Sequence, residues 1–238
     1  YYTQGQHAAS NTLPATDLAV VLQVISKLDS DGFTVGTAAA GNENTKTIYW
    51  FAFDGAAAAA ASGTYSMAVG SYTGNGTSQS VTGLAFRPDL VIIKHSDQAT
   101  DQYAVWTSST MPADSTAYFN NAVANFATAI TSINSDGFSV GASATVNTSA
   151  DTYHWQAFGN AWRPDKRTGA ANFMVGGYMG DALDSRDIKL APFQPDLVAN
   201  KQTGANAGVY RLSSQSGDLS FRFDSVVETA NYIQALNS

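Results

Sequence analysis

The chain of 238 residues repeats itself at an offset of about 105 positions. Ser30–Gly36 returns almost unchanged as Ser135–Gly141. Further segments recur at nearly the same offset: Tyr49–Phe53 as His154–Phe158, Ser71–Gly76 as Gly177–Ala182, and Arg87–Val91 as Gln194–Val198. Solenoid repeats run from about 20 to 50 residues, so this longer period indicates a duplicated unit of domain size.

The two copies are not arranged as a simple tandem pair. Residues 63–170 contain every repeated segment once and in order, and we predict that they form a complete unit. Residues 1–62 hold only the second half of a unit, and residues 171–238 hold only the first half. Because half a β-sandwich would expose unpaired strand edges, we expect these two pieces to form a split second unit. The two pieces pair either within one chain or between neighbouring chains. We favour pairing within one chain, since the tether raises the effective concentration of each piece near the other.

Alternating apolar and small polar residues predict β-strands at Tyr65–Val69 and Asn172–Gly176, and the apolar run Leu90–Ile93 predicts another. Gly, Asn and Asp clusters separate these segments. Helical patterns are weak, and we expect short helices only at Thr16–Lys27 and Ser115–Ile130. The sequence therefore predicts an all-β chain of two related antiparallel units, each resembling a β-sandwich or jelly roll, with few short helices.

Each Ser-Asp-Gly turn is expected to precede a strand, namely Phe33–Val35 in one copy and Phe138–Val140 in the other. The aromatic segments Thr47–Ala52 and Thr152–Ala157 follow loops rich in Asn, Thr and Ser. We therefore predict a hairpin of strand, turn and strand after each Ser-Asp-Gly.

Charge and composition limit the partners that the chain can have. The net charge is −7 and the pI about 4.7, which argues against binding to nucleic acid or to an anionic membrane. No stretch approaches the roughly 18 consecutive apolar residues of a membrane span. There is no cysteine, so neither disulfides nor thiolate metal sites can form, and we expect no cofactor.

The sequence shows no convincing catalytic group, and we predict that the chain is not an enzyme. Ser139 fits the G-x-S-x-G pattern of hydrolases, but no helix pattern follows it, so a hairpin strand is the favoured interpretation. His7, His95 and His154 have no second His or Cys at ligand spacing. His95 and Asp97, two positions apart on an expected loop, are too little for a catalytic pair.

Two weaker patterns suggest ligands. Asp29 and Asp31 resemble the start of a calcium loop, but the remaining acidic ligands are missing, and an ordinary Asp-Gly turn is favoured. Trp50 and Trp155 occupy equivalent strand positions and are expected in the two cores. Trp106 and Trp162 lack counterparts and are the candidates for stacking against a glycan, although burial is the favoured interpretation for both.

The motifs together resemble a repeat found in structural proteins of tailed bacteriophages. Its members read F-x-P-D-L-V-W-I-K, F-D-S-V-R-G and S-D-G-F-T-L-G, followed by an aromatic strand that ends in Trp. Gly83–Lys94, the two Ser-Asp-Gly-Phe segments and Phe223–Val227 fit this pattern, and Val227 departs from it where the family has Arg. The resemblance covers nearly the whole chain in two copies and transfers no catalytic residue.

The resemblance implies a setting outside a cell. We expect a non-enzymatic structural or adhesion protein of an extracellular assembly, such as the fibre, tail or head surface of a phage virion. Its partners would be further copies of itself or neighbouring assembly proteins. The alternatives are a receptor-recognition module that binds a cell-surface glycan, and a subunit of a secreted surface filament that polymerises by strand complementation.

Overall fold

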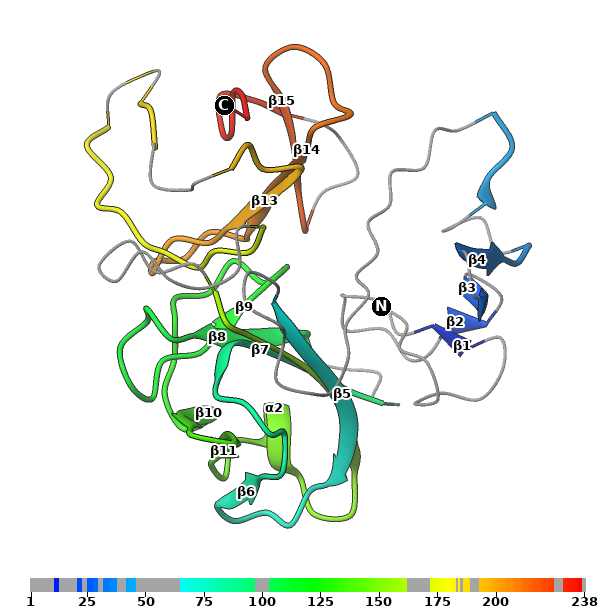
Figure 1. Cartoon of the computed structure of the whole chain (residues 1–238), viewed down its shortest axis with the longest axis vertical. Helices are drawn as coiled ribbons and strands as arrows, with labels where there is room; N and C mark the ends of the chain where they lie inside the picture. Colours follow the sequence, from blue (N-terminus) through cyan, green and yellow to red (C-terminus); the bar gives the residue numbers. More distant parts are fainter. Residues whose placement is uncertain are drawn as a thin grey trace.

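The structure is a computed structural model of the whole chain (Figure 1). It describes residues 11–12, 21–22, 25–29, 32–37, 42–45, 65–96, 103–161, 172–182, 184, 186–188, 193–224 and 229–236.

All strand pairs in this part of the chain are antiparallel. The N-terminal strands are β1 (Asn11–Thr12), β2 (Val21–Leu22), β3 (Ile25–Asp29) and β4 (Gly32–Val35). The middle region contains β5 (Ser66–Thr73), β6 (Gln79–Val81), β7 (Pro88–His95), β8 (Val105–Ser108), β9 (Ala117–Tyr118), β10 (Ile130–Asn134), β11 (Gly137–Val140), the short helix α2 (Ala144–Asn147) and β12 (Thr152–Gly159). The C-terminal strands are β13 (Leu197–Asn200), β14 (Val209–Leu212), β15 (Leu219–Arg222) and β16 (Thr229–Ala230).

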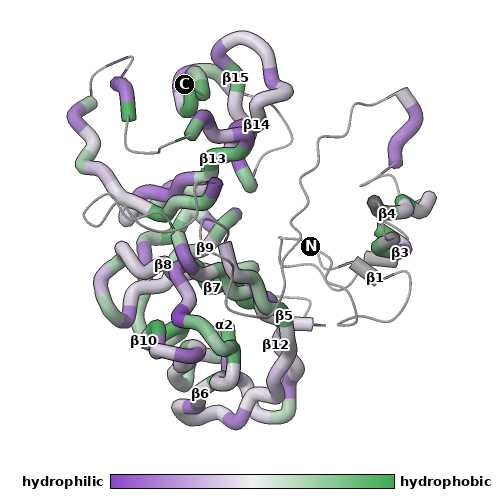
Figure 2. The backbone as a smooth tube through the Cα atoms, in the orientation of Figure 1, coloured by the Kyte–Doolittle hydropathy of each residue, from purple (hydrophilic) through white to green (hydrophobic). Residues whose placement is uncertain are grey.

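The middle region forms a two-layered sandwich. One layer is a five-stranded sheet in the order β5-β12-β7-β8-β9, and the other is a three-stranded sheet in the order β10-β11-β6. Their facing side chains form one core, to which β7 and β12 contribute Val91, Ile93 and Tyr153 and the smaller sheet contributes Phe138 and Val140. All five are fully buried. Figure 2 shows the hydrophobic stretches of β7, β10 and α2 that supply this core.

The close approach of β12 to β5 depends on a glycine. Trp155 of β12 lies opposite Gly70 of β5 and is 7% exposed, and its ring meets that of Phe138 edge to face at 5.5 Å. A Cβ atom at Gly70 would lie 2.3 Å from the Trp155 ring. The indole therefore fills the space that any side chain at position 70 would need.

The C-terminal strands form a separate sheet in the order β13-β14-β15-β16. This sheet packs against the loop that follows β9, where the Phe119 and Phe223 rings meet at 5.0 Å. The amide of Gly208 donates to the Phe119 carbonyl at 2.7 Å, and the amide of Asn125 donates to the Thr203 carbonyl at 2.9 Å. In Figure 1 these strands stand above β8 and β9, while the β3–β4 hairpin is at the right of the view.

The predicted all-β class is confirmed, and α2 is the single helix whose full length falls within the described residues. The helix expected at Ser115–Ile130 was wrong, since this region contains β9, loops and the start of β10. The helix expected at Thr16–Lys27 was also wrong, because Val21–Leu22 and the start of β3 are strands. The Val and Ile residues in that segment favour a strand over a helix, and pairing with neighbouring strands outweighs the weak helical spacing.

The hairpin predicted after the second Ser-Asp-Gly was wrong in its partner, whereas the partner predicted in the first copy lies outside the described residues. The strand after each Asp-Gly turn pairs with the strand before it, as β3 with β4 and β10 with β11. β12 does not pair with β11; it lies between β5 and β7. The strand predicted at Asn172–Gly176 was also wrong, since only Met174 forms a single bridge there. The predicted strand Thr47–Ala52 lies outside the described residues.

Replacing Gly70 by Val should destabilise the chain by about 1–3 kcal/mol, because the added atoms overlap the Trp155 ring. The matched control is Ser71→Val, since Ser71 is the exposed neighbour in the same strand. Urea unfolding of both variants measures the difference. Equal stabilities of the two variants would contradict the packing described here.

Candidate functional site

A group of interacting polar and aromatic side chains lies where β12 begins. Tyr153 of β12 is fully buried between Tyr72 of β5 and His95 at the end of β7. The Tyr72 and Tyr153 rings stack at 5.3 Å, and the His95 ring meets Tyr153 edge to face at 4.7 Å. The pairing of β12 with β5 places Tyr72 opposite Tyr153, and its pairing with β7 places His95 opposite the same residue. The three rings therefore meet.

His95 lies against the carboxylate of a residue that the sequence did not single out. Its Nε2 atom lies 3.0 Å from Oδ2 of Asp151, one position before β12. The His95 side chain is fully buried, whereas that of Asp151 is one quarter exposed. Asp97, the acidic neighbour considered from the sequence, lies outside the described residues. No local pattern marks Asp151, because its contact with His95 arises only when β12 pairs with β7.

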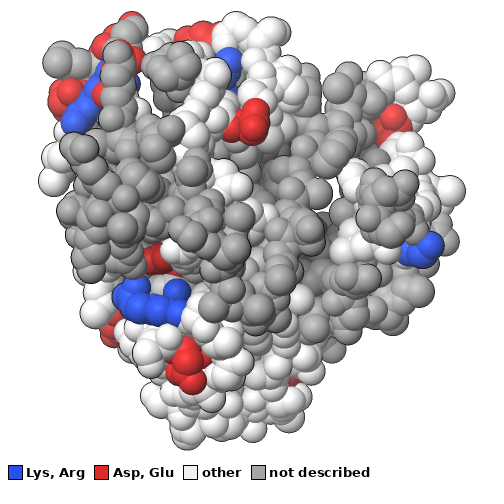
Figure 3. Space-filling model, in the orientation of Figure 1, with Lys and Arg blue, Asp and Glu red and all other residues white. Residues whose placement is uncertain are grey.

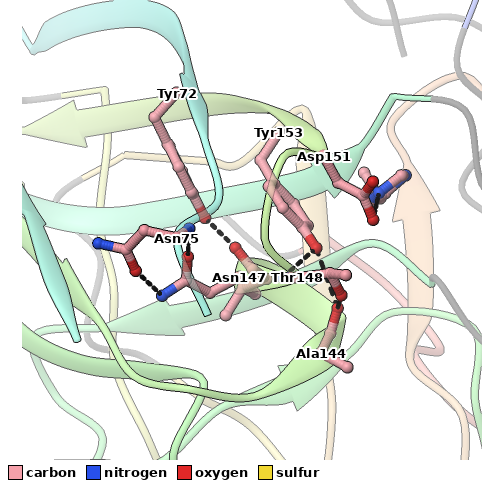
Figure 4. Close-up of polar contacts among 9 residues, drawn as sticks. Tyr72, Asn75, Ala144, Asn147, Thr148, Asp151 and Tyr153 are labelled. Atoms are coloured by element: carbon pink, nitrogen blue, oxygen red, sulfur yellow. Dashed lines mark hydrogen bonds and ion pairs between the residues drawn. The ribbon is translucent and has the colours of Figure 1, made fainter. Parts of the chain in front are cut away.

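The two tyrosine hydroxyl groups hold the short helix α2. Tyr72 donates to the Val146 carbonyl at 2.6 Å, and Tyr153 donates to the Ala144 carbonyl at 3.0 Å (Figure 4). The Tyr153 oxygen also accepts from the Thr148 amide at 2.8 Å. A four-residue helix cannot satisfy its terminal backbone groups internally, so these side chains supply the missing partners.

Asn147, the last residue of α2, is the most highly connected side chain of the group. It is fully buried. Its Oδ1 accepts from the amide of Asn75 and from Nε2 of Gln79, both at 2.8 Å. Its Nδ2 donates to the carbonyls of Gly141, at 2.8 Å, and Thr77. Both ends of one amide group therefore join α2 to the β5–β6 loop and to the end of β11.

This arrangement contains an acid, an imidazole and two phenols, and the contacts described above join these groups to one another and to the backbone of α2. A general base must come within hydrogen-bond reach of a substrate, and the His95 ring is enclosed in the core. The Tyr153 and Tyr72 hydroxyl groups are engaged with the backbone of α2. We therefore describe the group formed by Tyr72, His95, Asn147, Asp151 and Tyr153 as the α2 clamp.

A second polar clamp occurs in both copies of the repeat. Asp89 accepts from the hydroxyl of Ser109 at 2.7 Å and from the amide of Ala161 at 2.9 Å, and it is 3% exposed. In the other copy Asp196 accepts from the hydroxyl of Ser213 at 2.9 Å. The Pro-Asp motif thus ties the start of one strand to the end of the next. This agrees with the structural role expected from its place before an apolar run.

A buried arginine organises the C-terminal sheet, and sequence reasoning missed it. Arg211 of β14 is 5% exposed and donates to backbone carbonyls of Leu219, Gln215, Gly217 and Ile233. A lone Arg between Tyr and Leu gives no local sign of this role. Its four backbone partners hold the loop between β14 and β15 and the segment after β16.

Of the two tryptophans considered for glycan stacking, the structure describes Trp106. Trp106 lies on β8, partly buried, with its ring 6.0 Å from that of Phe119. Its Nε1 is buried and has no hydrogen-bond partner among the described residues. Trp162 lies outside the described residues. Trp155 occupies the core as predicted, while its counterpart Trp50 also falls outside the described part of the chain.

The two residues considered as calcium ligands, Asp29 and Asp31, are described only in part. Asp29 ends β3, and Asp31 lies outside the described residues. In the equivalent turn, Asp136 accepts from the Gly83 amide at 3.3 Å through Oδ2. The described residues contain no group of three or more His, Cys, Asp or Glu arranged to hold a metal ion.

Ser139 lies in strand β11, with its hydroxyl 2.8 Å from that of Ser80 and accepting from Nδ2 of Asn134 at 2.9 Å. This is the hairpin strand favoured from the sequence. The expectation that no helix follows was wrong, since α2 begins at Ala144. Ser139 is nevertheless paired on both sides within its sheet and does not lie at the turn where the nucleophile of a hydrolase elbow stands. Within the described residues, no helix has the length and apolar character that a membrane crossing requires.

Comparison with known proteins gives one match. The model of a family described as a domain of unknown function (DUF7483) matches residues 61–173. This range contains every element from β5 to β12. No curated protein and no solved structure matches the chain.

Replacing Asn147 by Ala should destabilise the chain by about 2–3 kcal/mol, because it removes four hydrogen bonds of a fully buried side chain, one of them to the carbonyl of the buried Gly141. The control is Ser149→Ala, which changes an exposed side chain two positions away. Thermal and urea unfolding measure both. A loss no greater than that of the control would show that the Asn147 bonds contribute little.

Stability should also fall at alkaline pH because of Tyr72. Burial, together with the neighbouring Tyr153, raises the pKa of Tyr72 above its usual range. Above about pH 10 the unfolded chain therefore releases a proton that the folded chain retains, so the free energy of unfolding decreases as pH rises.

Tyr72→Phe should remove part of this alkaline slope and, near neutral pH, cost about 1 kcal/mol for the bond to Val146. Tyr178→Phe, which changes an exposed tyrosine, is the control. Urea titrations between pH 7 and pH 11 measure both effects. An alkaline slope that is identical in the Tyr72 variant and the unmodified chain would rule out this contribution.

Proposed function

We propose that this chain is a non-enzymatic structural or adhesion protein of an extracellular assembly, specifically of a bacteriophage virion, where it forms part of a fibre, the tail or the head surface. The observation that supports this most directly is the α2 clamp. Its acid, imidazole, phenol and amide groups bind one another and the backbone of nearby loops. Such an arrangement favours a rigid sandwich that presents a fixed surface for contacts with other proteins.

The distribution of charge is consistent with this role. On the face shown in Figure 3, the visible Lys and Arg side chains are divided into small groups, and acidic side chains lie near several of them. Arg222 and Asp224 form one such pair at 2.6 Å, and Arg186 and Asp181 form another at 3.2 Å. With a net charge of −7, the chain favours contacts with proteins or neutral glycans over contacts with phosphate backbones.

Glycan binding is the second candidate function. It is favoured by Trp106, whose ring lies on β8 and remains partly accessible to solvent. The exposed part of such an indole can stack against the apolar face of a sugar ring. A secreted surface filament built by polymerisation of the same β-rich unit is the alternative assembly to the virion.

One experiment separates these functions. Antibodies raised against the purified chain are applied to virions and to surface filaments isolated from the source culture, with immunogold labelling and quantitative mass spectrometry. The virion proposal predicts regular labelling and a fixed copy number per particle. Label confined to filaments would select the filament, and the absence of the chain from both would refute an assembly role. A glycan array, with Trp106→Ala as the control, tests whether a glycan is bound through this residue.

A further inference from the structure

The chain contains a single Asn-Gly dipeptide, Asn75-Gly76, in the loop between β5 and β6. Both residues are exposed. Asn followed by Gly is the dipeptide in which an asparagine side chain loses its amide group most readily, because glycine has no side chain to obstruct the reaction. The loop is therefore a candidate for a chemical modification that needs no other protein.

The loop requires a glycine at this position. Gly76 has a φ of +72°, in the left-handed region that favours glycine. A Cβ atom there would lie 3.7 Å from the Cβ atom of Ser149, an ordinary contact. The backbone conformation, and not a lack of space, accounts for the glycine. The fold thus keeps a reactive dipeptide at its surface.

The reaction joins two neighbouring groups of the chain. The main-chain nitrogen of Gly76 forms a bond to Cγ of Asn75 and the Cγ–Nδ2 bond breaks. Ammonia leaves with the proton of the Gly76 nitrogen, and a succinimide ring remains. Water then opens the ring: addition at Cγ gives aspartate with a normal peptide bond, whereas addition at the main-chain carbonyl gives isoaspartate, in which the chain runs through the side chain.

The side chain of Asn75 is held in a state that does not hinder this attack. Its Oδ1 atom accepts from the amide and the hydroxyl of Thr77, at 2.8 and 3.2 Å, and from Nδ2 of Asn147 at 3.3 Å (Figure 4). These donors draw electron density from Cγ and stabilise the negative charge that develops on Oδ1 during the attack. Protection must therefore come from the nucleophile.

The nucleophile is withheld by the last residue of α2. The Gly76 amide donates to the main-chain carbonyl of Asn147 at 3.0 Å. The nitrogen attacks only after it has lost its proton, and a hydrogen bond made by the protonated form opposes that loss. The Asn147 side chain fixes the preceding residue, because its Oδ1 accepts from the Asn75 amide at 2.8 Å. One buried residue therefore holds both reacting residues.

We propose that Asn75 is a site of spontaneous deamidation that α2 keeps closed, and that the reaction proceeds from a locally opened state in which the β5–β6 loop has left Asn147. Folded proteins open single loops in this way without unfolding globally. The inference concerns the chemistry of this loop and does not depend on the proposed function, so either can fail alone.

The isoaspartate product cannot return to the original structure. It adds a methylene group to the main chain between Gly74 and Gly76, whose amides donate to the carbonyls of Asp151 and Asn147 at 2.8 and 3.0 Å. These two bonds fix the spacing of the loop, and a longer main chain cannot satisfy both in the same geometry. The modification therefore makes a reversible opening of the loop permanent.

Peptide mapping by mass spectrometry measures the reaction directly, since aspartate and isoaspartate both differ in mass from asparagine and are separated by chromatography. The full chain is incubated at mildly alkaline pH, once folded and once in guanidinium chloride. Deamidation of Asn75 should be at least about tenfold slower in the folded chain, because there the reaction waits for a local opening.

Three variants locate the gate. Asn147→Ala removes the bonds to the amide and to the side chain of Asn75 and should accelerate deamidation of the folded chain by about tenfold. Ser149→Ala changes an exposed neighbour and should leave the rate unchanged. Gly70→Val, which is expected to lower stability by a similar amount through the contact with Trp155, controls for global unfolding.

The other outcomes overturn the proposal. Equal rates in the folded and the denatured chain would show that α2 does not protect Asn75, and an Asn75 that stays unmodified in denaturant would exclude the site. Equal acceleration by Asn147→Ala and Gly70→Val would show that the reaction waits for global unfolding.

Amide hydrogen exchange of the unmodified chain gives a measure that needs no variant. The Gly76 amide should exchange faster than the amide of Ala157, which lies in the centre of β12 and is fully buried, because the loop opens without unfolding the sheet. Equal protection of the two amides would assign the opening of this loop to global unfolding and contradict the proposal.

Discussion

The sandwich depends on strand β12, which is hydrogen-bonded on both sides and buried on both faces. β5 lies along one edge of this strand and β7 along the other, in continuous register. Its side chains on one face enter the core, with Tyr153 and Trp155 among them, and on the opposite face His154 is also buried. The Gly70 contact, the stacking of Tyr72 on Tyr153 and the approach of His95 to Asp151 exist because this strand is inserted between two others.

Around this strand, polar side chains fix the loops. Asn147 joins α2 to two loops, Tyr72 and Tyr153 hold the backbone of α2, and Asp89 joins the ends of two strands and the segment after β12. A buried amide or hydroxyl group is costly unless its partners are present, so each of these side chains selects one loop conformation. The sandwich therefore gains a defined shape with little regular structure between its strands.

The sequence predicted the features that depend on local pattern and repetition. The strand class, the Asp-Gly turns, the core position of Trp155 and the role of the Pro-Asp motif follow from alternation, turn chemistry and comparison of the two copies. Features that depend on pairing across the chain could not be found in this way. Asp151 and His95 are distant in sequence, so their contact leaves no local pattern. β11 pairs with the strand before it and not with β12, and this could not be predicted because the length of a loop does not determine which sheet the next strand joins.

The order of strands along the chain has a kinetic consequence. Tyr72 and Val146, joined by a hydrogen bond, are 74 positions apart, and β12 is the last strand of its sheet to be synthesised. Contacts between distant residues must overcome the entropy of closing a long loop, which slows folding. Until β12 arrives, β5 and β7 each present an unpaired edge, and a similar aromatic segment has already been made upstream. Closing the gap between β5 and β7 therefore awaits the strand that is made last, so the folding rate of the sandwich depends on how fast this distant segment pairs with both.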